Sequence, residues 1–283
     1  MKRLLTPLAF LTLPFLSVAQ DLPAPSPGAT VTQRVGLADI TVNYSRPSAK
    51  GRRIFGDLVP MGQVWRTGAN HCTVFETTGM LVINGQKLPA GKYAMFTIPG
   101  EDKWEVMFNN KNDQWGSDEY NAEEDALKIQ KAAVRPAPST ESFLIFFDNL
   151  KDDKAQMILR WEKMEVVLDI EAPSQEQAMA NIKEALSKDD ADFMAYARSA
   201  SFCVDRGIEP KMALEWAQKS VGMEKKYWNT FTLAKAQASL NMYKEAIATG
   251  QEAVALAGTE KDGGAQKNYQ AKVDEWTMKA AGK

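Results

Sequence analysis

Two different periods of hydrophobic residues divide the chain near Pro173. From about residue 39 to residue 170, apolar residues alternate with polar ones, which is typical of β-strands with one buried face. The alternation is clearest at Ile40, Val42 and Tyr44, at Trp104, Val106 and Phe108, at Met157, Leu159 and Trp161, and at Val166, Leu168 and Ile170. We therefore expect about seven short strands that pack as an antiparallel β-sandwich.

Turn residues separate these segments. Asn84-Gly85 is the pair that most readily adopts the positive φ angles of a two-residue hairpin, so it predicts a hairpin after residues 80–83. Pro89-Ala90-Gly91 and Pro99-Gly100 bound a further strand over residues 92–98. The sequence thus predicts a β domain over residues 20–172.

After Pro173 the hydrophobic period becomes that of helices. Ser174 and Gln177 have the spacing of a capping box before the first predicted helix. Small residues then recur with a period near 34: Ala178, Ala213 and Ala246, each followed seven positions later by Ala185, Ser220 and Ala253. This spacing is similar to the tetratricopeptide helix-hairpin repeat, and an ordinary helical bundle is the alternative. We expect such a helical domain over residues 173–283.

The first nineteen residues have the pattern of a signal peptide. Met1-Lys2-Arg3 is cationic, residues 4–16 are mostly apolar, and Ser17-Val18-Ala19 offers small residues for cleavage. The apolar run is shorter than the roughly 20 residues of a membrane-spanning helix, so a permanent anchor is the weaker alternative. We expect a protein exported to the periplasm or the extracellular space, without a transmembrane segment.

The amino-acid composition argues against several classes of function. The chain has 34 Lys+Arg and 36 Asp+Glu, a balance that argues against nucleic-acid binding. One His and two Cys do not suffice for a structural zinc site, and no Gly-rich cofactor motif is found, so we expect no metal and no cofactor. Cys72 and Cys203 are expected to be separate buried residues rather than a disulfide.

A basic block interrupts the otherwise acidic β domain, which carries 17 basic and 21 acidic residues between Gln20 and Glu171. Only Asp57 opposes its five cations, which are Arg46, Lys50, Arg52, Arg53 and Arg66. This local reversal of sign leaves room for an anion site in a chain of nearly neutral net charge.

Four motifs in and after this block resemble a bacterial exported family known as domain of unknown function 2911. They are Tyr44-Ser45-Arg46-Pro47, Gly51-Arg52 to Phe55-Gly56, Trp65-Arg66-Thr67-Gly68-Ala69-Asn70, and Pro89-Ala90-Gly91-Lys92-Tyr93. The resemblance covers about residues 25–171. It implies an all-β domain, sometimes followed by tetratricopeptide-like helices, and it implies no activity because none is assigned to the family.

The basic block favours binding over catalysis. A guanidinium matches the geometry of a carboxylate or phosphate, and a tryptophan face can stack on a sugar ring. We therefore expect a binding cleft for an anionic, glycan or peptide ligand, with the helical repeats binding a protein partner. The candidate ligand-binding residues are Tyr44, Arg46, Arg52, Trp65, Arg66, Asn70 and His71.

Three alternatives remain open from the sequence. In the first, Arg46 and Arg66 pair with acids such as Glu76 or Asp57, and Trp65 packs in the core. In the second, the protein is an envelope hydrolase that uses His71, the only histidine, with Ser45 or Ser48 as nucleophile. In the third, the whole chain is a structural or scaffold protein.

Overall fold

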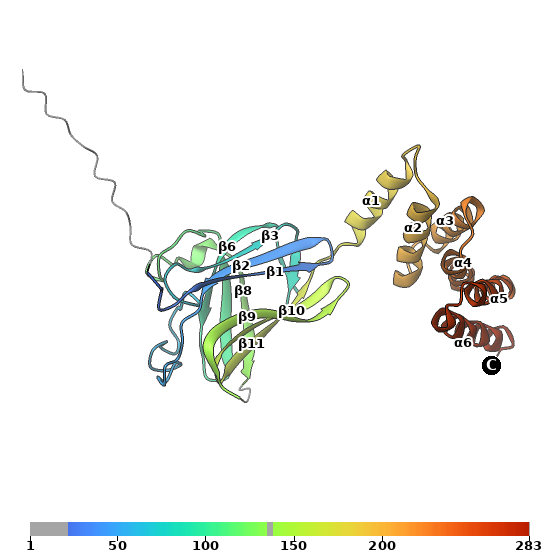
Figure 1. Cartoon of the computed structure of the whole chain (residues 1–283). Coiled ribbons are helices and arrows are strands. Elements are labelled where there is room, and N and C mark those ends of the chain that lie inside the picture. Colours follow the sequence, from blue (N-terminus) through green and yellow to red (C-terminus); the bar gives the residue numbers. More distant parts are fainter. Residues whose placement is uncertain (1–21, 135–137, 283) are drawn as a thin grey trace, which may run out of the picture. The chain divides into compact units, whose positions relative to one another are not determined.

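The computed structural model describes residues 22–134 and 138–282, so the predicted signal peptide at residues 1–19 lies outside them. The chain divides into two compact units, Met1–Ser174 and Gln175–Lys283. Strands make up the first unit and helices the second (Figure 1). The predicted α+β organisation in two parts is confirmed.

The first unit is built from strands whose inward-facing residues are the predicted apolar ones, such as Ile40, Val42 and Leu168. Asn84 and Gly85 have φ angles of 48° and 84° and join two paired strands, which confirms the predicted hairpin. In chain order the strands are β1 (Gly28–Val35), β2 (Ala38–Ser45), β3 (Thr73–Thr77), β4 (Leu81–Ile83), β5 (Gln86–Leu88), β6 (Gly91–Ile98), β7 (Lys103–Asn109), β8 (Asp125–Val134), β9 (Thr140–Lys151), β10 (Lys154–Glu162) and β11 (Met164–Glu171), and the short 3-10 helix η1 (Ala122–Glu124) precedes β8.

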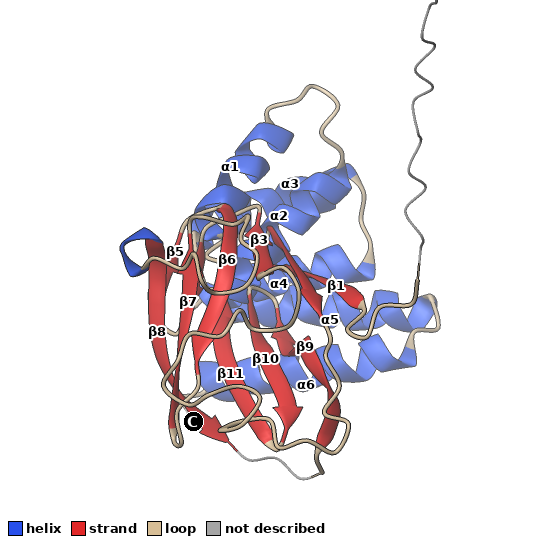
Figure 2. Ribbon diagram, turned by 90° about the vertical axis from the view of Figure 1, so that its left-hand side faces the viewer, coloured by secondary structure: helices blue, strands red, loops and turns tan. Residues whose placement is uncertain are grey.

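The strands form one antiparallel sheet that curls into a nearly closed barrel, so the expected sandwich is wrong. The order is β1-β2-β3-β6-β7-β8-β11-β10-β9, with the β4–β5 hairpin attached to β11. Figure 2 shows β3, β6, β7 and β8 side by side in this order. The last strand, β9, returns to β1 (Figure 1). Alternation did not distinguish the two folds, because both bury one face of every strand.

The barrel closes through the end of β2 and the residue that follows this strand. The Tyr44 hydroxyl donates to the carbonyl of Ile145 at 3.2 Å and accepts from the Ile145 N–H at 3.1 Å. Arg46 Nε donates to the carbonyl of Phe143 at 2.9 Å. These bonds join residues about one hundred positions apart and attach the end of β2 to β9.

Aromatic rings fill one part of the barrel interior. Trp65 lies 5.2 Å from Phe143, 5.8 Å from Trp161 and 6.0 Å from Phe55 between ring centroids. Trp104 packs on Phe55 at 4.8 Å. All five rings are buried, so they form a continuous apolar centre that supports the loops around it.

The second unit contains helices with well-defined ends. Asp192 caps one helix by accepting from the N–H of Ala195, Gly207 ends that helix in the left-handed conformation, and Pro210 begins the next. The helices in the described part of the chain are α1 (Gln175–Leu186), α2 (Phe193–Arg206), α3 (Pro210–Met223), α4 (Tyr227–Ser239), α5 (Tyr243–Thr259) and α6 (Gly263–Ala280).

The small residues of the predicted repeat behave differently in different helices. They are fully buried in α3 and α5, at Ala213, Ser220, Ala246 and Ala253. Helix α1 buries none of its residues, and its predicted contact residue Ala185 is exposed. The side-chain amide of Gln177 donates to Asn181 one turn later within α1. The repeat of packed small residues is therefore found in α3 and α5 alone among these three helices.

Candidate functional site

The Trp65–Asn70 motif forms a tight turn against the end of β2. The backbone of Trp65 pairs with Thr97, and its indole N–H donates to the carbonyl of Gly68 at 3.1 Å. Gly68 has a φ of 152°, and a Cβ atom there would lie 3.1 Å from the carbonyl oxygen of Ser45. Glycine is therefore required where the turn approaches β2 most closely.

This turn forms one wall of a cavity of about 250 Å³ at the aromatic centre of the barrel. Three of the predicted site residues meet there: Arg52, Trp65 and Arg66. Within the described part of the chain, the other lining residues are Ser26, Pro47, Leu58, Val59, Gly68, Ala69 and Trp161, so no acidic side chain lines the cavity.

The two arginines are held in different ways. Arg52 donates from Nε to the carbonyl of Ala49 at 2.9 Å and from Nη2 to that of Ser48 at 2.7 Å, so backbone carbonyls orient it. The Nε atom of Arg66 is buried and has no hydrogen-bond partner among the described residues. A buried donor without an acceptor is costly, because it has lost its water and gained no bond in return. The described part of the fold thus provides no acceptor for this donor of Arg66.

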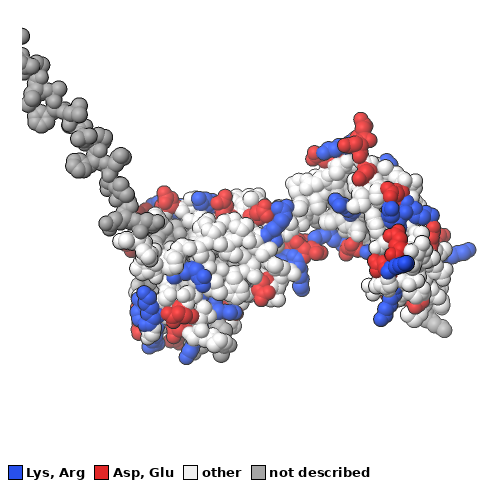
Figure 3. Space-filling model, viewed as in Figure 1, with Lys and Arg blue, Asp and Glu red and all other residues white. Residues whose placement is uncertain are grey.

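Lys and Arg side chains gather on the part of the barrel from which the loop after β2 projects (Figure 3). In that loop Lys50, Arg52 and Arg53 are exposed, next to the exposed Asp57. The basic block is therefore a surface feature as well as a wall of the cavity, and it favours the approach of an anion.

Trp65 offers no open face for stacking. Its side chain is 8% exposed, and the ring of Trp161 is stacked on it with an interplanar angle of 22°. Phe55 and Phe143 approach it edge-on. The indole can contribute an apolar wall to a ligand in the cavity, but not the flat platform that a sugar ring needs.

The remaining predicted site residues lie elsewhere. Tyr44 and Arg46 use their polar atoms to hold β9, and Arg46 pairs with no acid in the described structure. Asn70 donates its amide to the hydroxyl of Ser45 at 3.2 Å and to the carbonyl of Ser26 at 3.3 Å. His71 lines a different hollow and lies edge-on to the exposed Trp115, with ring centroids 4.4 Å apart.

The serines proposed as nucleophiles are engaged by other groups. Ser48 is hydrogen-bonded to Ser142 at 2.9 Å, and Ser45 accepts from the Asn70 amide. No hydrogen bond between His71 and either serine is found in the described residues. The geometry therefore gives the hydrolase alternative no base–nucleophile contact on which to build.

Sequence reasoning missed Trp161, which lines the cavity from β10 and lies far from the basic block along the chain. Its only sequence signal was the alternation that it shares with other core residues. Cys72 and Cys203 are both buried and unbridged, in separate units. Within residues 22–134 and 138–282, no helix is long and apolar enough to span a bilayer, and no three His, Cys, Asp or Glu residues cluster as metal ligands would.

Comparison with known proteins places the barrel in a family without an assigned activity. No curated protein and no solved structure matches the chain significantly. One family model, described as a protein of unknown function, DUF2911, matches residues 26–170. The match includes every strand of the barrel except the final residue of β11 and spans just over half of the chain. The chain therefore belongs to the DUF2911 family of proteins of unknown function.

Proposed function

We propose that the barrel is a non-catalytic binding module for a small ligand with a carboxylate or phosphate group. The observation that carries the proposal is the cavity that Arg52 and Arg66 both line with no carboxylate among the described lining residues. An oxyanion in the cavity would accept hydrogen bonds from both guanidinium groups, whose planar donors match a carboxylate or phosphate. The lining residues supply no His, Cys or carboxylate for acid–base or nucleophilic chemistry, which favours binding over catalysis.

The surroundings of the two arginines define the rest of the ligand. Leu58, Val59 and the indole of Trp65 form an apolar wall beside them. A ligand with an anionic head and a short apolar body would bury that body against this wall. Benzoate and inorganic phosphate are therefore useful probes, because they share the anionic head and differ in the apolar body.

Replacing Arg66 with alanine is expected to weaken the binding of benzoate to the full chain at least about tenfold, since a hydrogen bond to a charged group contributes about 1.5–3 kcal/mol. Titration calorimetry at low ionic strength would measure the affinity. We expect benzoate to bind more tightly than phosphate. Arg66→Lys keeps the charge but loses the planar fork, so it should recover only part of the affinity.

Arg53→Ala is the matched control, because Arg53 is an exposed cation of the same loop that does not line the cavity. It should change the affinity for benzoate little. Equal losses in Arg53→Ala and Arg66→Ala would assign the binding to the general positive charge of the loop. No loss in Arg66→Ala would rule out the cavity as the binding site.

We further propose that the helical unit forms tetratricopeptide-like hairpins that bind a protein partner. A hollow of about 390 Å³ lies between α2, α4, α5 and α6, and Lys235, Lys272 and Lys279 line it together with Tyr243 and with Asp205, the ion-pair partner of Lys235. These residues offer aromatic surface and cationic groups to an acidic peptide. Export by a signal peptide at residues 1–19 is part of the same proposal and would place such a partner in the periplasm or outside the cell.

The double variant Lys272→Gln, Lys279→Gln is expected to lose a protein partner that the wild-type chain retains from an envelope extract. Its helices should remain intact, because both lysines are exposed and their pairs with Glu275 contribute little to stability. Arg66→Ala should retain the same partner. Equal recovery by the double variant and the wild type would count against this surface.

A further inference from the structure

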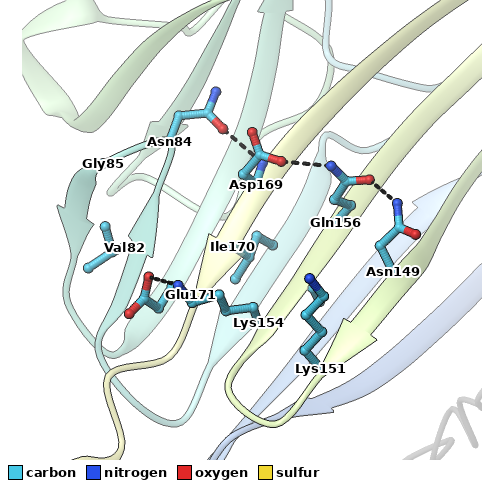
Figure 4. A pocket seen from close by; sticks show the side chains of 11 residues that line it. Val82, Asn84, Gly85, Asn149, Lys151, Lys154, Gln156, Asp169, Ile170 and Glu171 are labelled. Atoms are coloured by element: carbon cyan, nitrogen blue, oxygen red, sulfur yellow. Dashed lines mark hydrogen bonds and ion pairs between the residues drawn. The ribbon is translucent and has the colours of Figure 1, made fainter. Parts of the chain in front are cut away.

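A second groove of the barrel, separate in its residues from the arginine cavity, is lined by polar side chains of three elements. It has a volume of about 430 Å³ and lies between the β4–β5 turn, the β9–β10 hairpin and β11 (Figure 4). Gln156 and Asp169 alternate with the buried residues Met157 and Leu168, so they project from the outer face of the sheet. The groove is therefore open to solvent on the outside of the barrel.

A chain of hydrogen bonds fixes these side chains. The amide of Asn149 donates to the side-chain oxygen of Gln156, and Gln156 Nε2 donates to Asp169 Oδ1 at 2.8 Å (Figure 4). Lys131 Nζ approaches the other oxygen of Asp169 at 2.7 Å. The hydrogen bonds from Lys131 and Gln156 lower the pKa of Asp169, so its carboxylate is an acceptor at neutral pH. The groove is thus oriented before any ligand arrives.

Asn84 adds a third amide whose orientation is also determined by the fold. The side-chain oxygen Oδ1 of Asn84 accepts from the backbone N–H of Asp169 at 2.8 Å. The backbone N–H of Asn84 donates to the backbone carbonyl of Asp169, also at 2.8 Å. Its Nδ2 has no partner among the described residues, and the same is true of Oδ1 of Asn149. The groove therefore offers unused amide donors and acceptors in fixed positions.

The formal charges of the side chains that line the groove balance, with Lys151 and Lys154 against Asp169 and Glu171. Lys154 pairs with Glu171 at 3.2 Å, and Lys131 from outside the lining pairs with Asp169, so both carboxylates already have cationic partners. The partly exposed Val82 supplies an apolar surface beside the polar groups. Such a site gains little from a net charge on the ligand, and it matches a molecule that both donates and accepts hydrogen bonds while presenting C–H groups.

We propose that this groove binds a neutral polyhydroxylated ligand, namely a sugar ring or a short glycan. Adjacent hydroxyl groups of a sugar donate to Asp169 and to the free oxygen of Asn149, and they accept from Asn84 and Lys151. The volume lies within the range of about 300–1,000 Å³ that is common for small-molecule sites. The site shares no residue with the arginine cavity, so it stands independently of anion binding there.

The test is a nuclear magnetic resonance titration of the full chain with D-glucose, D-galactose, N-acetyl-D-glucosamine and cellobiose up to tens of millimolar. At least one of these neutral sugars is expected to shift the side-chain amide signals of Asn84, Asn149 and Gln156 with a common, saturating dissociation constant. Gln156→Ala should weaken binding about tenfold, because it removes one contact and the orientation of two more. Asn149→Gly should weaken it about fivefold.

Asn149→Gly is expected to keep the fold intact, because glycine accommodates the φ of 50° at this position without strain. A loss of binding in this variant would therefore not result from unfolding. Gln270→Ala in α6 is the control, because Gln270 makes the same amide-to-carboxylate bond to Asp274 outside the groove. It should bind sugars as the wild type does. The proposal is overturned if none of the four sugars moves the three amide signals, if D-glucuronate or inorganic phosphate alone moves them, or if both groove variants bind as tightly as the control.

Discussion

Replacing Trp161 with alanine is expected to lower the free energy of unfolding of the barrel by about 3–5 kcal/mol, the usual loss for a large aromatic residue removed from a core. Trp161 is 2% exposed and packs on Phe55, Trp65 and Phe143. Its indole N–H donates to the carbonyl of Glu141 at 3.1 Å. Alanine would leave a cavity in the aromatic centre and remove the partner of that carbonyl.

Urea unfolding of the full chain, read by hydrogen exchange at the amides of β6, β7 and β10, would follow the barrel separately from the helices. Trp161→Phe should lose less stability, because a ring still fills part of the space. Trp115→Ala is the control, since Trp115 is 63% exposed and should change the free energy by only about 0.5 kcal/mol. A loss in Trp161→Ala as small as that of the control would show that this aromatic centre does not support the barrel.

The same tryptophan shows how far the sequence could predict the site. Arg52, Trp65 and Arg66 lie within one short segment, so their proximity could be anticipated from the chain. Trp161 reaches the cavity from β10, and its alternation with polar residues looks the same whether an inward side chain meets other core residues or a cavity. Only the closure of the sheet brings β10 to the Trp65 turn.

The closure also explains why two predicted site residues have structural roles. Arg46 belongs to the basic block and Tyr44 lies two residues before it, which made both residues candidates for ligand contacts. In the structure their donors serve carbonyls of β9 that would otherwise lack partners at the seam of the barrel. The sequence shows that Tyr44 and Arg46 can form hydrogen bonds. It does not show which groups they bond to, because this depends on which strands, distant along the chain, lie next to each other in the barrel.

In the helical unit, too, the sequence pattern does not show which elements pack against each other. The spacing of Ala178, Ala213 and Ala246 is regular, yet only the last two are fully buried. A small residue permits two helices to approach closely but does not supply the second helix. In α5 the approach is real, because a Cβ at Gly250 would lie 2.6 Å from Val273 of α6. In α1 the same pattern leaves its face only partly covered.

Replacing Asn229 with leucine is expected to lower the free energy of unfolding of the helical unit by about 2–4 kcal/mol, because two part-buried backbone groups and the buried hydroxyl of Ser220 lose their partner. Asn229 lies in the first turn of α4 and is fully buried. Its amide donates to the hydroxyl of Ser220 at 2.9 Å and to the carbonyl of Glu224 at 2.8 Å, and its oxygen accepts from the N–H of Lys226. Ser220 in turn donates to the carbonyl of Phe193 in α2.

This network ties three helices together through one side chain, so the two ends of the asparagine amide can be tested separately. Asn229→Asp keeps the acceptor for Lys226 but turns a second oxygen toward the carbonyl of Glu224, and it buries a charge, so it should destabilise at least as much as leucine. Asn268→Ala on the exposed side of α6 is the control and should stay within about 0.5 kcal/mol of the wild type. Hydrogen exchange at the amides of α2, α3 and α4 would measure all three variants. If leucine cost less than about 1 kcal/mol, or if only α4 lost protection while α2 and α3 kept theirs, the three helices would be held together by apolar packing rather than by this network.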